Sequence, residues 1–202
     1  MSDQQRRQSP LVRFDLGARA TRSPDAAAII VRERAFLGHL NLRGDPLDPR
    51  LAAAVSAVLG AAPPITANTV HEAQGNALYW LGPDECLIVT PEGRAAAIES
   101  ALRTALADLW VAVTDVSGGQ TVVVVRGDPV RELLAKGCPI DLHPRAFGVG
   151  QCAQSHLAKT PILIRPLDDE CSFEIVVRRS FADYFWLWLE DAAAEYGLAV
   201  AA

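Results

Sequence analysis

Two short strings of this chain occur twice, in the same order and at nearly the same spacing. RGDP stands at residues 43–46 and again at 126–129, an offset of 83, and DEC stands at 84–86 and again at 169–171, an offset of 85. One such repetition is what chance produces, but two in register indicate that a unit of this length has been duplicated. We therefore expect two related halves that fold in the same way.

Each copy of RGDP leads into a helical pattern. In the first half, apolar residues such as Leu51 and Val55 follow at helical spacing, and Asp48 is suited to cap the helix. In the second half, Asp128 is the expected cap and Gly137 the expected stop, because glycine readily takes the left-handed conformation that ends many helices. The two helices therefore occupy equivalent places in the two halves.

Each copy of DEC lies in a turn between two strand-like apolar runs, and each hairpin precedes an amphipathic helix. These helices are expected at about 93–109 and 180–196, a closing strand of the first half at 110–116, and an opening strand of the second half, buried on both faces, at 121–125. The SGG string at 117–119 is flanked by apolar strands and is expected to be a hairpin turn. Each half then has the order β–α–β–β–α, with a further strand to close it.

That order predicts an α+β fold of two tandem ferredoxin-like units. The two sheets are expected side by side in one globule, because no linker rich in serine and glycine separates the halves. We place the first unit at residues 26–116 and the second at 117–202. Residues 1–25, with two prolines, are expected to form an N-terminal arm that needs a partner to become ordered.

The bulk composition excludes several classes of protein. The chain has 202 residues, 50% of them hydrophobic, and a net charge of −5, which permits a sizeable core and argues against a nucleic-acid binder, since such proteins present a basic face. No apolar stretch approaches the ~20 residues of a membrane span, and the polar N-terminus lacks the apolar run of a signal peptide. The 4 cysteines form no CxxC pair, so we expect reduced thiols and a cytoplasmic location.

Two cysteine–histidine pairs are candidates for chemistry. In the string GCPIDLHP, Cys138 and His143 could form a nucleophile pair, but a proline separates them; the end of a helix followed by a turn is the favoured interpretation, and a redox or packing role for the cysteine is an alternative. Cys152 and His156 lie in a strand-like segment, about 13 Å apart, too far to share a metal ion. No GxGxxG dinucleotide fingerprint occurs. We therefore expect no catalytic, cofactor-binding or metal site on this chain.

The last predicted helix carries more aromatic surface than one buried face requires. Its apolar residues span roughly 260° of the helix circumference, whereas a helix on the surface of a domain needs a stripe of about 100°. Such a surplus is typical of a protein–protein contact, and a helix central to its own domain is the alternative. Trp186→Asp is accordingly expected to weaken assembly and to leave the fold of the chain intact. The residues of this expected partner interface are Phe181, Tyr184, Phe185, Trp186, Leu187 and Trp188.

Several of these strings resemble one protein family. CPIDL at 138–142, RSFADYFWLWL at 179–189 and LGPDECLIV at 81–89 are similar to the gamma subunit of heterotetrameric sarcosine oxidase. That family in turn resembles the folate-binding half of the glycine cleavage T-protein, whose strand, turn, strand and helix start are matched by DVSGGQTVVVVRGDP at 115–129. The T-protein also has an acidic pair shortly before its next strand, but residues 156–166 contain no acid here. The resemblance therefore implies the T-protein-like fold and argues against the folate chemistry.

The resemblance implies an accessory subunit that holds no cofactor of its own. In that family the complex oxidatively demethylates sarcosine to glycine, giving hydrogen peroxide and, with tetrahydrofolate, methylenetetrahydrofolate. The alpha, beta and delta partner subunits are then implied to carry FAD, FMN, NAD, tetrahydrofolate and zinc. The alternatives are a gamma subunit of a related N-methyl amino acid dehydrogenase and a stand-alone folate-dependent one-carbon transfer enzyme.

Overall fold

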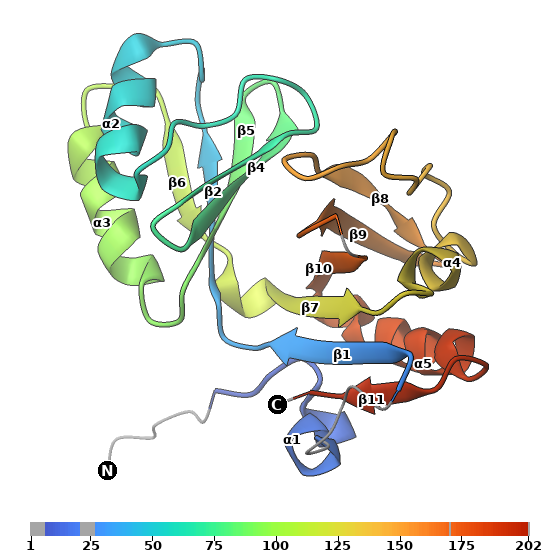
Figure 1. The fold of residues 1–202 in the computed structure, drawn as a ribbon. Coiled ribbons are helices and arrows are strands. Elements are labelled where there is room, and N and C mark those ends of the chain that lie inside the picture. Colours follow the sequence, from blue (N-terminus) through green and yellow to red (C-terminus); the bar gives the residue numbers. More distant parts are fainter. Residues whose placement is uncertain (1–6, 21–26, 170, 202) are drawn as a thin grey trace, which may run out of the picture.

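The strands form two sheets, which the computed structural model describes over residues 7–20, 27–169 and 171–201 (Figure 1). The five-stranded sheet consists, in spatial order, of β3 (Val70–Ala73), β4 (Asn76–Gly82), β5 (Glu85–Thr90), β2 (Gly38–Arg43) and β6 (Ala112–Asp115). The six-stranded sheet consists of β8 (Ala153–Leu157), β9 (Thr160–Pro166), β10 (Ser172–Arg178), β7 (Gln120–Arg126), β1 (Ile29–Arg34) and β11 (Leu198–Val200).

The longer helices lie in pairs on the two sheets. The five-stranded sheet packs against α2 (Pro49–Leu59) and α3 (Ala95–Ala105), and the six-stranded sheet packs against α4 (Val130–Ala135) and α5 (Ala182–Ala193). The short α1 (Leu16–Arg19) precedes β1. Single 3-10 turns lie at Val12–Phe14, Ser117–Gly119 and Arg179–Phe181.

The order of the elements repeats along the chain, as the paired strings predict. The series β2-α2-β3-β4-β5-α3-β6 returns as β7-α4-β8-β9-β10-α5-β11. Each half therefore has three strands between its two helices, one more than the order β–α–β–β–α expected from the sequence, because β3 and β8 precede the predicted hairpins. The spatial order of the strands repeats as well, since β3-β4-β5-β2-β6 corresponds to β8-β9-β10-β7 followed by β11. Arg43 and Arg126, the first residues of the two RGDP strings, end the equivalent strands β2 and β7.

Strand β1 has no counterpart in the first series, because it is inserted between β7 and β11. It runs antiparallel to β7, with Val31 opposite Val125, and parallel to β11, with Ile29 opposite Leu198. Ile29 and Val31 point into the core beneath α5. Residues 29–34 therefore pair in the sheet of the second unit, not in the unit at 26–116 where the sequence placed them. Their hydrogen-bonding partners lie about 90 residues away in β7 and about 170 residues away in β11, beyond the reach of any local pattern.

The two sheets face each other, with the helices on the outer sides (Figure 1). One apolar cluster fills the space between the five-stranded sheet and α2 and α3, and a second fills the space between the six-stranded sheet and α4 and α5. A third cluster, with Tyr79, Val89 and Val122 among its members, lies between the sheets. Each sheet is thus buried on both faces, which gives four layers in the order helix, sheet, sheet, helix.

Two glycine-containing segments differ from expectation. Ser117–Gly119 connects β6 to β7, which lie in different sheets, so the SGG string is a crossover and not a hairpin turn. At the end of α4, Gly137 is not in the left-handed conformation. A Cβ atom there would lie 2.6 Å from the Trp188 ring and 2.9 Å from the Ala158 nitrogen, so glycine permits a close approach of the end of α4 to α5 and to the turn after β8.

The caps of the first helices in the two halves differ as well. Asp48 caps α2 as expected, since its Oδ1 accepts a hydrogen bond from the Arg50 nitrogen at 2.8 Å. In α4 the capping position belongs to Pro129 and not to Asp128, and no side chain accepts a hydrogen bond there.

The described part of the N-terminal arm packs on its own chain. Leu11 is 1% exposed and belongs to the core of the six-stranded sheet, and the Phe14 ring lies 5.8 Å from the Trp186 ring of α5. Arg13 pairs with Asp183 at 2.7 Å. Residues 7–20 therefore need no partner chain to be placed, contrary to the expectation for residues 1–25; the other residues of that range lie outside the described part. No helix among the described residues is long and apolar enough to span a bilayer.

This packing changes the expected effect of substitutions at Trp186, which should destabilise the fold of the chain itself and not only its assembly. Trp186 is fully buried between the arm and the sheet, so Trp186→Ala should lower the free energy of unfolding of the isolated chain by about 3–5 kcal/mol, measured by urea denaturation. Leu187→Ala, at a neighbouring position that is 51% exposed, is the matched control and should change it by less than about 0.5 kcal/mol. Equal stability of the two variants would contradict the burial of the indole.

Candidate functional site

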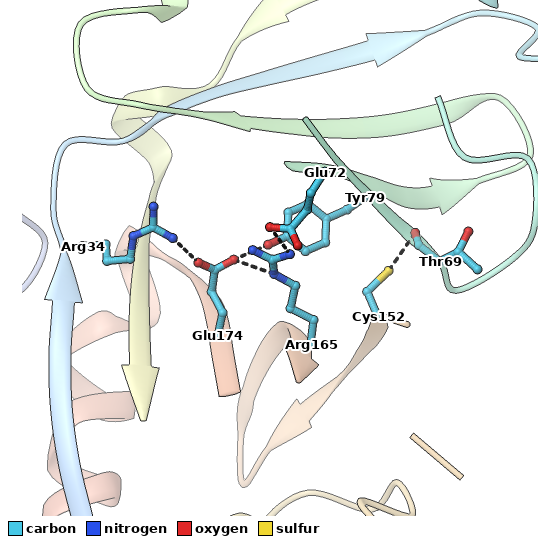
Figure 2. A network of polar contacts seen from close by, with 7 residues as sticks. All are labelled: Arg34, Thr69, Glu72, Tyr79, Cys152, Arg165 and Glu174. Atoms are coloured by element: carbon cyan, nitrogen blue, oxygen red, sulfur yellow. Dashed lines mark hydrogen bonds and ion pairs between the residues drawn. The ribbon is translucent and has the colours of Figure 1, made fainter. Parts of the chain in front are cut away.

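The space between the two sheets holds a network of charged side chains within an otherwise apolar layer (Figure 2). Tyr79 on β4 and Glu72 on β3 come from the five-stranded sheet. Arg165 on β9, Glu174 on β10 and Arg34 on β1 come from the six-stranded sheet. Because strand residues alternate between faces, Glu174 points to this layer, whereas its neighbours Phe173 and Ile175 point to the helices.

Glu174 is the centre of the network, and its side chain is 1% exposed. Its Oε1 accepts hydrogen bonds from Arg165 Nε, at 2.9 Å, and from the Tyr79 hydroxyl. Its Oε2 accepts a hydrogen bond from Arg34 Nη1. Arg165, 4% exposed, also pairs through Nη1 with Glu72 Oε1 at 2.7 Å, and its guanidinium carbon lies 5.3 Å from the centre of the Tyr79 ring. The network therefore joins the two sheets directly.

The charges of this network are fixed by their mutual contacts. Burial by itself raises the pKa of Glu174, but Arg165, the Tyr79 hydroxyl and Arg34 together hold that pKa below its ordinary value. Burial and the nearby Glu174 carboxylate raise the pKa of Tyr79 well above its ordinary value. Burial lowers the pKa of Arg165, yet Tyr79, Glu174 and Glu72 outweigh it and raise the pKa overall. At neutral pH Glu174 is thus an ionised carboxylate, Tyr79 a neutral phenol and Arg165 a charged guanidinium.

Such a site is suited to holding the sheets together and not to acid–base catalysis. A general base needs a pKa near the working pH and free access to a proton, whereas Glu174 has a lowered pKa and three donors on its two oxygens. A cavity of about 410 Å³ opens beside the network and is lined in part by Arg34 and Glu72. Their side chains are 39% and 58% exposed, so solvent reaches the rim of the network while its centre stays covered.

The thiols in this region are buried and protonated. Cys152 Sγ lies 3.3 Å from the Thr69 carbonyl oxygen, and burial raises the pKa of its thiol to about 11. Burial likewise raises the pKa of Cys86, on the helix side of the five-stranded sheet, to about 12. Because the thiolate is the reactive form, neither cysteine is activated as a nucleophile.

The cysteine–histidine pairs do not form reactive sites in the structure. Cys138 is 5% exposed and its Sγ lies 3.8 Å from Ser155 Oγ, whereas His143 is exposed in the following turn, where its backbone nitrogen donates to Asp141. Cys152 is buried and His156 is exposed on β8. Within the described residues, no group of three or more histidine, cysteine, aspartate or glutamate side chains is placed to hold a metal ion.

The six residues of the expected partner interface on α5 are divided between the core and the surface. Phe185 and Trp186 are 1% and 0% exposed, so these two belong to the interior of the chain. Tyr184 and Leu187 are 39% and 51% exposed and remain available to a partner. Phe181 and Trp188 are partly buried against the same core. The apolar surplus of α5 arises in large part because the N-terminal arm covers a second face of this helix.

His39 on β2 is a further buried titratable group, only 1% exposed and paired in register with Val89 of the layer between the sheets. Burial lowers the pKa of its imidazole to about 4, because the charged form would lose its hydration, although the nearby carboxylates of Glu174 and Asp115 oppose this. His39 is therefore a neutral strand residue, in agreement with the absence of a motif around it.

Sequence reasoning missed the charged network. Its signal was present in two strands, where Glu174 is the one charged residue within SFEIVV and Arg165 the one charged residue within TPILIR. A single charge at an inward position of an apolar strand indicates a buried partner of opposite sign. The sequence could therefore have identified the two members separately, but not their pairing.

The comparisons with known proteins agree with this geometry. The family model described as sarcosine oxidase, gamma subunit family, matches residues 43–195. The sarcosine oxidase subunit gamma of Corynebacterium sp. (strain P-1) is 36% identical over 171 residues, which cover 85% of this chain and 83% of that protein. The corresponding subunit of Corynebacterium sp. (strain U-96) is 33% identical over 195 residues, which cover 96% and 94%.

Solved structures show the same fold. A chain of the heterotetrameric sarcosine oxidase from Corynebacterium sp. U-96, in complex with pyrrole 2-carboxylate, matches with a TM-score of 0.81 and 34% identity over 97% of this chain and 99% of that one. The glycine cleavage system aminomethyltransferase T from Bartonella henselae matches with a TM-score of 0.64 and 14% identity over 87% of this chain and 48% of that one. The α+β class and the T-protein-like fold expected from the sequence are confirmed.

Removal of the Glu174 carboxylate should destabilise the folded chain. Glu174→Ala leaves Arg165 buried without its main counter-charge, so we expect the free energy of unfolding to fall by about 3–5 kcal/mol. The double variant Arg165→Met/Glu174→Leu should recover much of this loss, because two apolar side chains need no hydration. Glu99→Ala, which removes an exposed ion pair with Arg103, is the control and should cost less than about 1 kcal/mol. A Glu174→Ala variant as stable as this control would contradict the role of the network in holding the two sheets together.

The buried imidazole of His39 predicts a loss of stability in acid. In the unfolded chain the imidazole has an ordinary pKa of 6.5, whereas in the folded chain it is about 4. The unfolded state therefore binds the extra proton between these values, so stability is full above pH 6.5 and falls as the pH drops towards 4, by up to about 3 kcal/mol. His39→Leu should flatten the unfolding free energy against pH in this window, and the exposed His143→Gln should not.

Proposed function

The chain belongs to the sarcosine oxidase gamma subunit family, and we propose that it acts as the accessory, structural subunit of a heterotetrameric sarcosine oxidase. The observation that carries this proposal is the near full-length likeness to one chain of a solved heterotetrameric sarcosine oxidase, at a TM-score of 0.81. The likeness extends over 97% of this chain and 99% of that chain.

The geometry of the described residues supports a structural role in the complex. The carboxylate between the sheets is saturated with donors, the thiols of Cys86 and Cys152 are protonated, and no metal cluster occurs in the part of the chain that the structure describes. We infer that the reaction takes place on the partner subunits, alpha, beta and delta, which hold FAD, FMN, NAD, tetrahydrofolate and zinc. The complex oxidatively demethylates sarcosine to glycine, with hydrogen peroxide and methylenetetrahydrofolate as products.

The outer face of α5 contributes to this assembly through its exposed residues. Tyr184 and Leu187 are large, apolar in most of their surface and open to solvent, and they lie beside the arm that covers the rest of the helix. Aromatic and aliphatic side chains of this kind form the centres of subunit interfaces. The stable core behind them, formed by Phe185, Trp186 and Leu189, holds them in place without requiring the partner.

Co-expression is the direct test of the subunit role. The tagged chain, expressed with the alpha, beta and delta subunits from the same genome, should purify as a flavin-yellow complex of four chains whose mass equals their sum. A chain that stays alone and binds tetrahydrofolate tightly would instead support the stand-alone one-carbon transfer enzyme. A chain that stays alone and binds neither flavin nor folate would contradict both functions.

A variant of α5 tests the contribution of this helix. Leu187→Asp places a charge on the proposed contact, so we expect the yield of the four-chain complex to fall at least about tenfold, since an unpaired charge buried at an interface is costly. The thermal midpoint of the isolated chain should not change, because Leu187 is 51% exposed. Val149→Asp, at a position that is 54% exposed in the loop before β8, is the matched control and should assemble normally.

A further inference from the structure

Trp110 is the most exposed large apolar side chain of the described residues. Its relative accessibility is 101%, whereas Trp186 of α5 is fully buried. It lies in the turn between α3 and β6, and β6 is an edge strand of the five-stranded sheet. An indole in full contact with water gains nothing for the fold of the chain itself, and tryptophan is the residue most enriched at the energetic centres of protein interfaces.

An open groove lies next to this indole. It has a volume of about 670 Å³, and Pro83, Val111 and Ala112 form its apolar walls. The backbone at Gly44 forms part of the groove and packs tightly, since a Cβ atom there would lie 2.7 Å from Val111 Cγ1. The groove is therefore formed by the end of β2, the turn between β4 and β5 and the start of β6.

The rim of the groove is acidic. Arg43, Asp45 and Asp84 contribute its charged side chains. The charge of Arg43 is engaged by Glu85 at 2.8 Å. Asp45 accepts a hydrogen bond from the Leu47 nitrogen, and neither Asp45 nor Asp84 forms an ion pair with any residue in the described ranges. The carboxylates of Asp45 and Asp84 thus lie near an exposed indole without a counter-charge from the described residues.

We propose that Trp110 and this groove form a docking site for a partner subunit of the heterotetramer, at a partner surface where arginine or lysine side chains surround an apolar pocket that receives the indole. The charge of the rim selects this occupant, because opposite charges attract across an interface. A second copy of the chain is disfavoured, since a symmetric contact would bring Asp45 and Asp84 of both copies together. The inference rests on the proposed function, but it concerns the edge of the five-stranded sheet at β6 and not α5, which packs on the six-stranded sheet.

The test measures binding of the chain to the co-expressed alpha, beta and delta subunits, purified without gamma and immobilised. Trp110→Ala should raise the dissociation constant at least about 30-fold, as the loss of a central interface residue does, and Trp110→Phe should restore part of the affinity. Asp45→Asn/Asp84→Asn should slow association at low salt and have little effect at high salt. Val149→Ala removes an apolar side chain that is 54% exposed in the loop before β8 and should leave binding unchanged.

The outcomes separate this inference from the function on which it rests. If the wild-type chain binds and Trp110→Ala binds equally well, the docking site is wrong and the subunit function stands. If the wild-type chain does not bind the partner subunits at all, both fail. If Trp110→Ala instead converts a dimer of the isolated chain into monomers, measured by light scattering, the occupant is a second copy and the proposal is overturned. The thermal midpoint of Trp110→Ala should equal that of the wild type, which excludes misfolding as the cause of any loss.

Discussion

The ion pair between Glu174 and Arg165 is the interaction on which the arrangement of the two sheets depends. Both side chains are almost wholly buried, and each also binds a residue of the opposite sheet, Tyr79 and Glu72 respectively. Charges in such a layer cost hydration, and they are tolerated only where every polar atom finds a partner. Two purely apolar sheet faces could pack in several relative positions. The hydrogen bonds and ion pairs of this network can all form in only one of them. It therefore fixes how the two halves face each other.

The duplicated units are not equivalent once they are packed. The insertion of β1 next to β7 widens the second sheet, and the N-terminal residues that precede β1 are thereby brought over α5. The outer layer of the second half is consequently covered by the chain itself, through Leu11 and Phe14, while the first half keeps an open sheet edge at β6. This asymmetry explains why an aromatic helix can be buried in one half and a single tryptophan exposed in the other.

The functional picture follows from what these layers leave accessible. The buried titratable groups are not activated, since the Glu174 carboxylate has a lowered pKa and the thiols of Cys86 and Cys152 have raised pKa values. The exposed large apolar side chains of the described residues include Tyr184 and Leu187 of α5 and Trp110 beside β6. A rigid body with such surfaces is suited to binding other chains. That agrees with membership of a family of subunits and with the T-protein-like fold.

The sequence by itself determined the duplication, through strings repeated at nearly equal offsets. It also determined the cap of α2 at Asp48 and the burial of β7, because these depend on spacing within a few residues, but it missed the short strands β3 and β8. Its strings also identified the family. Only the tertiary structure decided which sheet receives β1, which face of α5 the arm covers, and that Gly137 serves a close approach to Trp188. It also decided that Glu174 meets Arg165. These contacts join residues far apart in the chain. Hydrophobic periodicity predicts that a side chain is buried, but it does not predict which other side chain it contacts.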